Sequence, residues 1–591
     1  MEEGAFADNF VVEPKDTDEP FTGGRDDVPP EVAAAQNAIY KKYSYLRISK
    51  NKMDFDDFCF PKKFQLQPPQ KFCGEVMRPG SAQSRLLVDH KPGSGKTCLI
   101  IQILLPWLTH TKPILVMPAT LRINIRNELR SPCAGGRYLT DEEAAYISGL
   151  AVRSPERREV IAESNRRIDK DMMILSFNQF LSMHKSGRVP MTKLFIIDEA
   201  HYLGGTSQIA AAVEEYAAKL SETDAKIVAA TATPIFGNVK TLEPLFRVLG
   251  IPDFDIGKYV DVVDGVAKVV DRSGLLSKCA GFVSYYAGAP AYTYPKMTVH
   301  YERLLMSDFQ RRAFRKALEG KAFLTDESES ALDSFYSKSQ AVSMIAYPGG
   351  TAKEGAGLLA GQMDDIGKHS CKIGRLLKLM KKKRGPKGAK SGRGKQHMII
   401  YCRLKGAYGM AVIKKVLKAK GYFDFAKDGP GKARFAVLSG DETSNYKATV
   451  IDIFNSREND DCSQIQYILG TAVIREGVSF FRVGIMIVLS PCWSSEMMEQ
   501  IFMRVCRYCS HKNVPSRQRR VDIYVLLAWA TKPTRSIPAL DGELVSPGAL
   551  GALVPESIDE YIYARARLIN VLSAEASRVL ADAAIDKRLF Q

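Results

Sequence analysis

Two series of short apolar segments, separated by longer stretches with helical periodicity, dominate the chain. The first series is RLLVDH (85–90), PILVMP (113–118), MMILSF (172–177), KLFIID (193–198) and KIVAAT (226–231). The second is HMIIYC (397–402), RFAVLS (434–439), IQYILG (465–470), GIMIVLS (484–490) and VDIYVLLA (521–528). Continuously apolar strands that alternate with helices are typical of parallel sheets covered by helices on both faces. The sequence therefore predicts an α/β fold with two doubly wound parallel sheets.

The remaining segments complete the expected domain organisation. A length of 591 residues corresponds to three or four units of ordinary size. The C-terminal segment has the pattern of one long helix, with Ser557 as its expected N-cap. The expected parts are a disordered acidic arm (1–35), a first lobe (36–240), an inserted or linker region ending in a basic run (241–395), a second lobe (396–535) and a C-terminal helical tail (536–591).

The charge of the chain is large and unevenly distributed. The net charge is +17, but residues 1–31 contain ten acidic side chains against Lys15 and Arg25, so the remainder carries +25. A basic body of this size attracts polyanions, and nucleic acid is the first candidate. The run KKKRGPKGAKSGRGK (381–395) has eight basic residues and no acid, so it is expected to be a loop or linker. This run is compatible with DNA binding, with a nuclear-localisation signal or with a solvated loop.

The cysteines and the apolar runs indicate the setting. Eleven cysteines, an odd number, are scattered from Cys59 to Cys509, and the N-terminal sequence MEEGAFADNF has no signal-peptide pattern. We therefore expect a reducing, intracellular setting. No apolar run approaches the roughly 18 residues that a membrane-spanning helix requires, so no membrane partner is expected.

A glycine-rich loop follows the first strand. HKPGSGKT (90–97) lies between RLLVDH and the helical CLIIQILL. A strand, a glycine-rich loop and a helix N-terminus together form a phosphate cradle, because the glycines allow backbone N–H groups to approach the phosphates. Lys96 would reach the β- and γ-phosphates, and Thr97 would bind Mg²⁺. The predicted ATP-binding residues here are Pro92, Gly93, Ser94, Gly95, Lys96 and Thr97.

An acidic pair ends the fourth apolar segment. In KLFIIDEAH (193–201), Asp198 can hold the metal and Glu199 can orient and deprotonate the attacking water. Adjacent acids after an apolar run can also be a solvated strand end. With the phosphate loop about a hundred residues upstream, the pair instead predicts hydrolysis of a nucleoside triphosphate with Mg²⁺ as cofactor.

The order of these motifs resembles that of superfamily 2 helicases and translocases. A phosphate loop, DEAH and TATP (231–234) lie in the first lobe, while ILGTAVIREGVSFFRV (468–483) and EQIFMRVCRYCSH (499–511) resemble the fifth and sixth motifs. QLQPPQKF (65–72) resembles the glutamine motif, which makes Gln70 the candidate adenine reader. The resemblance implies two RecA-like lobes. It also implies that His201, Thr231 and Thr233 couple the acidic site to nucleic acid.

Several stretches outside the motifs resemble the poxvirus-type nucleoside triphosphate phosphohydrolase I and early transcription factor small subunit. They include GFVSYY (281–286), MSDFQRRAF (306–314) and AAIDKRLF (583–590). This resemblance implies a role in transcription of a large DNA virus, with a viral RNA polymerase or transcription factor subunit as partner. It implies location in the virion and the host cytoplasm, with the nucleus also open. One departure is His90, which stands where the phosphate loop usually begins with glycine.

The sixth-motif segment contains both a C-x-x-C pair and an arginine pair. Read as a helix, it places Gln500, Arg504 and Arg507 on one face and turns Cys506 and Cys509 toward the apolar side. A zinc site would need a second ligand pair, which the chain lacks, so no zinc is expected. Arg507 is the predicted arginine finger, with Arg504 as second candidate and Gln500 positioning water or nucleotide. A basic solvated helix face is the alternative.

The helicase resemblance also implies contacts to DNA, with RNA as an open alternative. Such contacts would be made mostly to the phosphates. Thr120 can instead be only an N-cap, and Phe177 can instead be a core residue. The candidate contacts are Thr120, Arg122, Ser176, Phe177 and Thr471.

The sequence therefore predicts an ATP-driven nucleic-acid translocase that serves viral transcription. A cellular SNF2-type DNA translocase is the alternative within the same enzyme class. A DNA-binding scaffold subunit with a purely structural ATP site is the alternative outside it.

Overall fold

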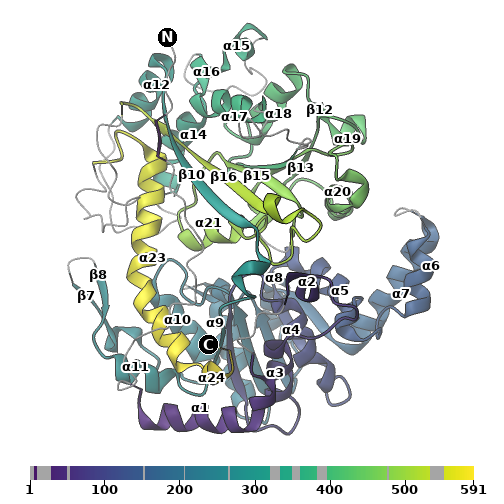
Figure 1. Ribbon diagram of the computed structural model, residues 1–591. Coiled ribbons are helices and arrows are strands. Elements are labelled where there is room, and N and C mark those ends of the chain that lie inside the picture. The colour runs from purple at the N-terminus through teal and green to yellow at the C-terminus, as the bar shows by residue number, and fades with distance from the viewer. Residues whose placement is uncertain are drawn as a thin grey trace. The chain divides into compact units, whose positions relative to one another are not determined.

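A computed structural model shows the fold of the chain (Figure 1). It describes residues 6–8, 28–48, 54–150, 154–204, 207–263, 266–319, 333–348, 360–381, 396–475, 478–532 and 552–590. The chain forms two compact units. One comprises residues 20–293 and 571–591 and is called here the phosphate-loop unit, because HKPGSGKT lies in it. The second unit comprises residues 1–19 and 294–570.

The phosphate-loop unit is built on a parallel sheet of six strands in the order β4-β3-β5-β6-β2-β9. All five apolar segments predicted for this lobe are strands, and β9 is the added member. The strands are β2 (Arg85–His90), β3 (Ile114–Met117), β4 (Met173–Ser176), β5 (Leu194–Asp198), β6 (Lys226–Thr231) and β9 (Val283–Tyr286).

Both faces of this sheet are buried, which is why its strands are continuously apolar. Leu87 and Ile197 face one core, and Val88 and Ile196 face the other, since successive residues of a strand point to opposite sides. The first core is closed by α8 (Phe177–Lys185), α9 (Gln208–Ser221), α10 (Leu242–Val248) and α11 (Arg272–Cys279). The second is closed mainly by α3 (Pro68–Val76), α4 (Lys96–Leu104) and α5 (Arg122–Leu129).

The phosphate-loop unit contains further elements outside this sheet. They are α1 (Pro30–Tyr43), α2 (Phe55–Cys59), α6 (Asp141–Ser148), α7 (Pro155–Asp171), the antiparallel pair β7 (Val260–Val263) and β8 (Val266–Val269), and α24 (Lys587–Phe590).

The second unit contains an eight-stranded sheet in the order β1-β10-β16-β15-β11-β14-β13-β12. Only β1 is antiparallel to its neighbour. In Figure 1 the arrows of β10, β16 and β15 lie side by side. The strands are β1 (Phe6–Asp8), β10 (Lys296–Leu305), β11 (His397–Tyr401), β12 (Phe423–Asp424), β13 (Arg434–Leu438), β14 (Tyr467–Gly470), β15 (Val483–Val488) and β16 (Arg520–Trp529).

Helices cover this second sheet as well. They are α12 (Asp308–Leu318), α14 (Ser337–Met344), α15 (Ala360–Asp364), α16 (Ile366–His369), α17 (Cys371–Lys381), α18 (Met410–Ala419), α19 (Phe425–Asp428), α20 (Ser444–Asn455) and α21 (Ser495–Phe502). None of the helices in the described part of the chain has the length and apolar composition needed to cross a membrane.

Strand β10 corrects the predicted domain boundaries. It pairs with β16 along its whole length, so the expected insertion 241–395 is divided between the two units near residue 293. The sequence did not indicate this strand because two of its buried positions are charged. The Glu302 carboxylate is paired with Arg375 at 2.6 Å, and Arg303 is paired with Glu560 at 3.2 Å. A buried charge is tolerated when it has such a partner, and it breaks the apolar pattern.

The two ends of the chain also differ from expectation. Most of the predicted acidic arm lies outside the described residues, but Phe6–Asp8 forms β1 and α1 already begins at Pro30. At the other end, α23 (Ile558–Ala583) is the long yellow helix of Figure 1. Ser557 is its N-cap, as predicted, because its Oγ accepts the Glu560 N–H at 3.2 Å. The helix begins in the second unit and ends in the phosphate-loop unit, so residues 552–590 are not a separate tail.

The basic run predicted at 381–395 lies outside the described residues except for Lys381, the last residue of α17. Its three interpretations therefore stay predictions.

Candidate active site

The predicted phosphate loop has the backbone geometry of a phosphate cradle. Strand β2 ends at His90, and α4 begins at Lys96. Gly93 and Gly95 have φ values of 84° and 79°, in the left-handed region that glycine occupies without strain. At Gly95 a Cβ atom would also lie 2.5 Å from Nε2 of Gln70. The loop therefore turns sharply and presents backbone N–H groups at a helix N-terminus.

Two polar side chains fit a bound phosphate group and its nucleotide. Ser94 is buried, and within the described residues its Oγ has no hydrogen-bond partner. Gln70 accepts the Gln67 N–H at 2.8 Å and donates through Nε2 to the Gly95 carbonyl at 3.2 Å. The predicted adenine reader thus already touches the loop, and its role toward adenine stays a prediction.

The acidic pair lies directly against the loop lysine. Asp198 is the last residue of β5, and its carboxylate is 3.5 Å from the Lys96 Nζ, while Glu199 is 3.1 Å from it. Burial raises the pKa of Asp198 to about 6, although Lys96 opposes this. Burial acts against the Lys96 ammonium, but the two carboxylates outweigh it, and the pKa of Lys96 is raised. These groups can bind a triphosphate, a divalent cation and a water molecule together.

The backbone of Glu199 is unusual. Its φ is 52°, in the left-handed region that residues with a Cβ rarely occupy. Such a conformation costs about 1–3 kcal/mol and persists where the surrounding structure imposes it, often at functional sites. The Glu199 carboxylate in this conformation contacts the Lys96 ammonium directly after the end of β5.

The three predicted coupling residues are in contact. The Thr231 Oγ accepts the Thr233 N–H at 3.1 Å and lies 3.0 Å from the His201 Nδ1. The same His201 nitrogen is 3.4 Å from Glu199. Because a hydroxyl oxygen has two lone pairs, Thr231 can accept from both the Thr233 N–H and a protonated His201 Nδ1, which also faces the Glu199 carboxylate. His201 therefore lies between the end of β6 and the acidic pair, and the coupling role of these three residues stays a prediction.

The predicted nucleic-acid contacts of this unit have different environments. Thr120 is exposed in a short turn, and Arg122 donates to the Gln179 Oε1 at 2.8 Å. The same oxygen accepts the Ser176 N–H, and the Ser176 hydroxyl caps α8. Residue Gln179 was missed by the sequence analysis, although S-x-x-Q is the signature of a capping box.

Phe177 is not displayed for base stacking. Its ring is buried, and it is stacked on Tyr202 with ring centroids 5.5 Å apart. The sequence left open whether Phe177 is a core residue, and the structure shows that it is. Thr471, in the second unit, is likewise buried directly after β14, and within the described residues its Oγ has no hydrogen-bond partner.

The helical interpretation of residues 499–511 is wrong beyond Phe502. Helix α21 ends there, and the chain then turns. The carbonyl groups of Arg504 and Ser510 accept the N–H groups of Phe480 and Arg482, so this backbone pairs with the fifth motif instead of continuing the helix. Gln500, Arg504 and Arg507 therefore do not form one helical face.

The two arginines nevertheless lie together against the fifth motif. Arg504 is 8% exposed and donates to the Val478 carbonyl at 3.5 Å. Arg507 is half-buried and donates to the Ser479 hydroxyl. Gln500 is half-buried in the last turn of α21.

The cysteines of this segment differ from each other. Cys506 is buried in the core of the second unit, as predicted, whereas Cys509 is half-buried with a φ of 54°. His511 is buried and lies 2.9 Å from the Val483 carbonyl, and burial lowers its pKa to about 4. The described residues around this segment do not gather a set of metal ligands.

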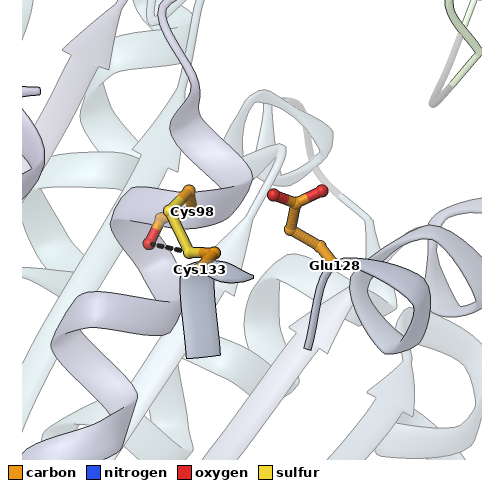
Figure 2. A group of neighbouring side chains, drawn as sticks. All are labelled: Cys98, Glu128 and Cys133. Carbon is orange, nitrogen blue, oxygen red and sulfur yellow. Dashed lines mark hydrogen bonds between the residues drawn. A yellow bond between two sulfur atoms is a disulfide. The ribbon is translucent and has the colours of Figure 1, made fainter. Parts of the chain in front are cut away.

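A disulfide lies beside the phosphate loop, although the odd number and scattered positions of the cysteines led us to expect a reducing setting. Cys98, in the first turn of α4, is bonded to Cys133 in the turn after α5, with Cα atoms 5.9 Å apart. Figure 2 shows the bond, with Glu128 nearby. Within the described residues these three side chains are the one group placed like metal ligands. Because the two sulfur atoms are bonded to each other, they do not offer the thiolates that a zinc site needs.

A parallel sheet with a phosphate loop after one strand and an acidic pair after another defines a nucleoside triphosphatase of the P-loop class. A sequence profile described as "DEAD/DEAH box helicase" matches residues 70–242, and one described as "Helicase conserved C-terminal domain" matches residues 373–509. The chain belongs to the superfamily 2 helicases, which are enzymes that hydrolyse nucleoside triphosphates.

Individual proteins are similar over most of the chain. The "Putative ATP-dependent RNA helicase" of Acanthamoeba polyphaga mimivirus is 33% identical over 83% of this chain and 87% of its own length. The "Termination factor NPH-I homolog" of African swine fever virus is 21% identical over 94% of this chain and 84% of its own. Among solved structures, the Pyrococcus furiosus Hef helicase domain is 14% identical, covering 77% of this chain and 94% of that chain at a TM-score of 0.37.

Proposed function

We propose that this helicase is a nucleic-acid-dependent ATPase that moves along DNA during transcription of a large DNA virus. The observation that carries the proposal is the continuous set of contacts from Lys96 through Glu199 and His201 to Thr231. The set connects a phosphate-binding loop to the strand end that the helicase resemblance assigns to coupling. A purely structural nucleotide site would not need a catalytic carboxylate in this position.

Different residues of the phosphate-loop unit would bind the ATP, hold the metal ion and activate the attacking water. The loop N–H groups, Ser94 and Lys96 would bind the phosphates, and Gln70 would contact the adenine. Thr97 and Asp198 would hold Mg²⁺, which neutralises the charge on the phosphate oxygens when it is bound. Glu199 would orient the attacking water and accept its proton.

In this proposal the arginines of the second unit complete the reaction. Arg507 is the first candidate for the arginine finger and Arg504 the second, because a guanidinium group stabilises charge on the transferred phosphoryl group. Gln500 would position water or nucleotide. The contacts of both arginines with Val478 and Ser479 support a joint action of the fifth and sixth motifs.

The transcription role is supported by a relative. A similar protein of African swine fever virus is named as a termination factor homolog. We infer from this similarity that the partners are DNA and a viral RNA polymerase or transcription factor subunit, with location in the virion and the host cytoplasm. Thr120 and Arg122 are the proposed nucleic-acid contacts with the most accessible positions, since Ser176, Phe177 and Thr471 are buried.

The decisive experiment measures ATP hydrolysis alone and with single- or double-stranded DNA or RNA. We expect hydrolysis to be stimulated by at least one polymer and to be lost in Glu199→Gln. Equal rates with and without every polymer would exclude the translocase. Hydrolysis-independent DNA binding with no measurable turnover would favour the scaffold subunit instead.

A second assay separates the viral from the cellular interpretation. Stimulation of transcript release from a stalled polymerase of a related large DNA virus is expected for the transcription role. Sliding of nucleosomes without any effect on transcript release would favour the SNF2-type alternative.

A further inference from the structure

The C-terminal segment 584–590 packs against the strand that lies beside the phosphate-loop strand. The Ile585 N–H donates to the Val283 carbonyl of β9 at 2.8 Å. The Phe590 ring lies with its centroid 6.2 Å from that of Tyr286, also in β9. Since β9 pairs with β2 from residue 87 to residue 90, residues 584–590 are connected through β9 to the strand that enters the loop.

Asp586 is the polar centre of this contact. Its side chain is fully buried, and its two oxygens accept the Ser284 hydroxyl and, at 3.0 Å, the Tyr285 N–H. Among the described residues no cation is paired with Asp586. Burial raises its pKa to about 7, against the opposing effect of Ser284 and the backbone donors. An uncompensated buried carboxylate is unfavourable for folding, and packing alone would be served better by an apolar side chain.

The contacts of Asp586 lead to the first residue of the phosphate loop motif. The Ser284 Oγ lies 2.9 Å from the His90 Nε2, and His90 directly precedes Lys91 at the end of β2. When Asp586 is ionised, it accepts a hydrogen bond from the Ser284 hydroxyl, which has only one proton to donate. The Ser284 oxygen must then accept a hydrogen bond from His90, which fixes His90 as the Nε2–H tautomer.

Few other titratable groups face this arrangement. Cys73 of α3 lies 3.5 Å from the Ser284 Oγ, and burial raises the pKa of this thiol above its usual range. Burial lowers the pKa of His90 to about 3, so the imidazole stays neutral. Of the charged side chains nearby along the chain, Asp582 of α23 and Lys587 are paired with each other at 2.6 Å.

We propose that Asp586 is a positioning residue of the ATP site, which acts through Ser284 to fix the orientation and tautomer of His90 and thereby the entry of the phosphate loop. The inference rests on the proposed hydrolysis of ATP at this loop. It assigns to residues 584–590 an indirect part in shaping the site.

Asp586→Asn tests the proposal with a side chain of nearly the same size. The Asn amide would donate to the Ser284 oxygen, the Ser284 hydroxyl would then donate to the His90 Nε2, and His90 would carry its own proton at Nδ1. Nitrogen NMR of the ¹⁵N-histidine-labelled full chain at pH 8.5, assigned with His90→Gln, should show this change of tautomer. We expect kcat/KM for ATP to fall about tenfold or more, as for other supporting partners of an active site.

Asp582→Asn is the matched control. Its carboxylate pairs with Arg272 and Lys587, and among the described residues it makes no hydrogen bond or ion pair with β2 or β9. Both variants are expected to lower the melting temperature, but only Asp586→Asn should change the tautomer and kcat/KM.

Ser284 provides a test that does not depend on the folding of the Asp586 variant. Ser284→Ala removes the hydroxyl that links Asp586 to His90 and should reproduce the loss of kcat/KM. Ser284→Thr keeps the hydroxyl and should retain most of the wild-type kcat/KM. A packing role predicts the opposite order, because the larger threonine must enter a fully buried position.

Wild-type tautomer and wild-type kcat/KM in Asp586→Asn would overturn the proposal, as would a threonine variant less active than the alanine variant. Failure of the proposed function would be seen separately. In that case the wild-type chain would not hydrolyse ATP, while the tautomer of His90 would still report on Asp586.

Discussion

The Lys96 ammonium lies 3.1 Å from a carboxylate oxygen of Glu199. The same nitrogen is 3.5 Å from Asp198, so the loop lysine is paired with both acids. Incoming phosphates would compete for this lysine and release the acids for metal and water. The pairing therefore keeps three charged, mostly buried groups compensated before the nucleotide arrives.

Replacing Glu199 with glutamine should separate catalysis from binding. The amide cannot accept the proton of the attacking water, so kcat is expected to fall about 10²- to 10⁴-fold. ATP affinity, measured by equilibrium binding, should be retained because the phosphate loop is unchanged. The exposed Glu222, in the same unit, supplies the control variant Glu222→Gln, which should hydrolyse ATP at the wild-type rate. Equal rates of hydrolysis in the two variants would show that Glu199 is not the catalytic base.

Hydrolysis should decline as the pH falls through about 6. Burial raises the pKa of Asp198 to that value, and protonation removes the charge that would hold Mg²⁺. A raised carboxyl pKa favours folding of the protonated form, and this contribution is present at low pH and lost as the pH rises through about 6. Protonation of Asp198 should therefore lower the activity below pH 6 without destabilising the folded state. Profiles of kcat/KM and of circular dichroism between pH 5 and 8 would show whether the two curves separate.

Removing the Thr231 hydroxyl should affect both stability and coupling. Thr231→Val leaves the Thr233 N–H unsatisfied in a buried site, at a cost of about 1–3 kcal/mol. It also removes the contact with His201, so the ratio of polymer-stimulated to unstimulated hydrolysis is expected to fall. Thermal unfolding and ATPase assays would measure the two effects. An unchanged stimulation ratio in a destabilised variant would leave Thr231 with a structural role alone.

Arg507→Ala should lower kcat by about 10³-fold or more if this side chain is the arginine finger. Arg507→Lys is expected to recover little, because an ammonium lacks the planar fork of donors. The exposed Arg517 offers the control Arg517→Ala, which removes the same charge from the same unit. If Arg504→Ala alone shows the large loss, the finger is Arg504.

Reduction of the Cys98–Cys133 disulfide should destabilise the phosphate-loop unit. The bond joins residues 35 positions apart, and the chain-entropy relation gives about 3 to 4 kcal/mol for a loop of that length. Denaturant unfolding with and without dithiothreitol would measure the difference. The double variant Cys98→Ser/Cys133→Ser should be insensitive to the reductant. A wild-type midpoint that does not shift with reductant would contradict the expectation.

Much of the fold could be predicted because it depends on local patterns. The ten predicted apolar segments are all strands, since buried parallel strands need apolar side chains on both faces. The phosphate loop and the acidic pair are likewise contiguous in sequence, and their spacing already indicates their chemistry. The N-cap Ser557 was also predictable, because a capping side chain lies next to the helix that it begins.

Other features depend on residues that are distant in sequence. Helical periodicity continues beyond Phe502, but the backbone of residues 504–510 pairs with residues 480–482 and the helix stops. Strand β10 has buried charges whose partners, Arg375 and Glu560, lie far along the chain.

The sequence alone determined that this protein has two parallel α/β sheets, a phosphate loop and an acidic pair, because each is encoded within a few consecutive residues. Only the tertiary structure decided that Cys98 meets Cys133, that Lys96 is paired with Glu199, and that Asp586 reaches His90 through Ser284. These contacts join elements from 35 to several hundred residues apart. No local pattern specifies such pairs, since they arise from the packing of the sheets and helices around the core.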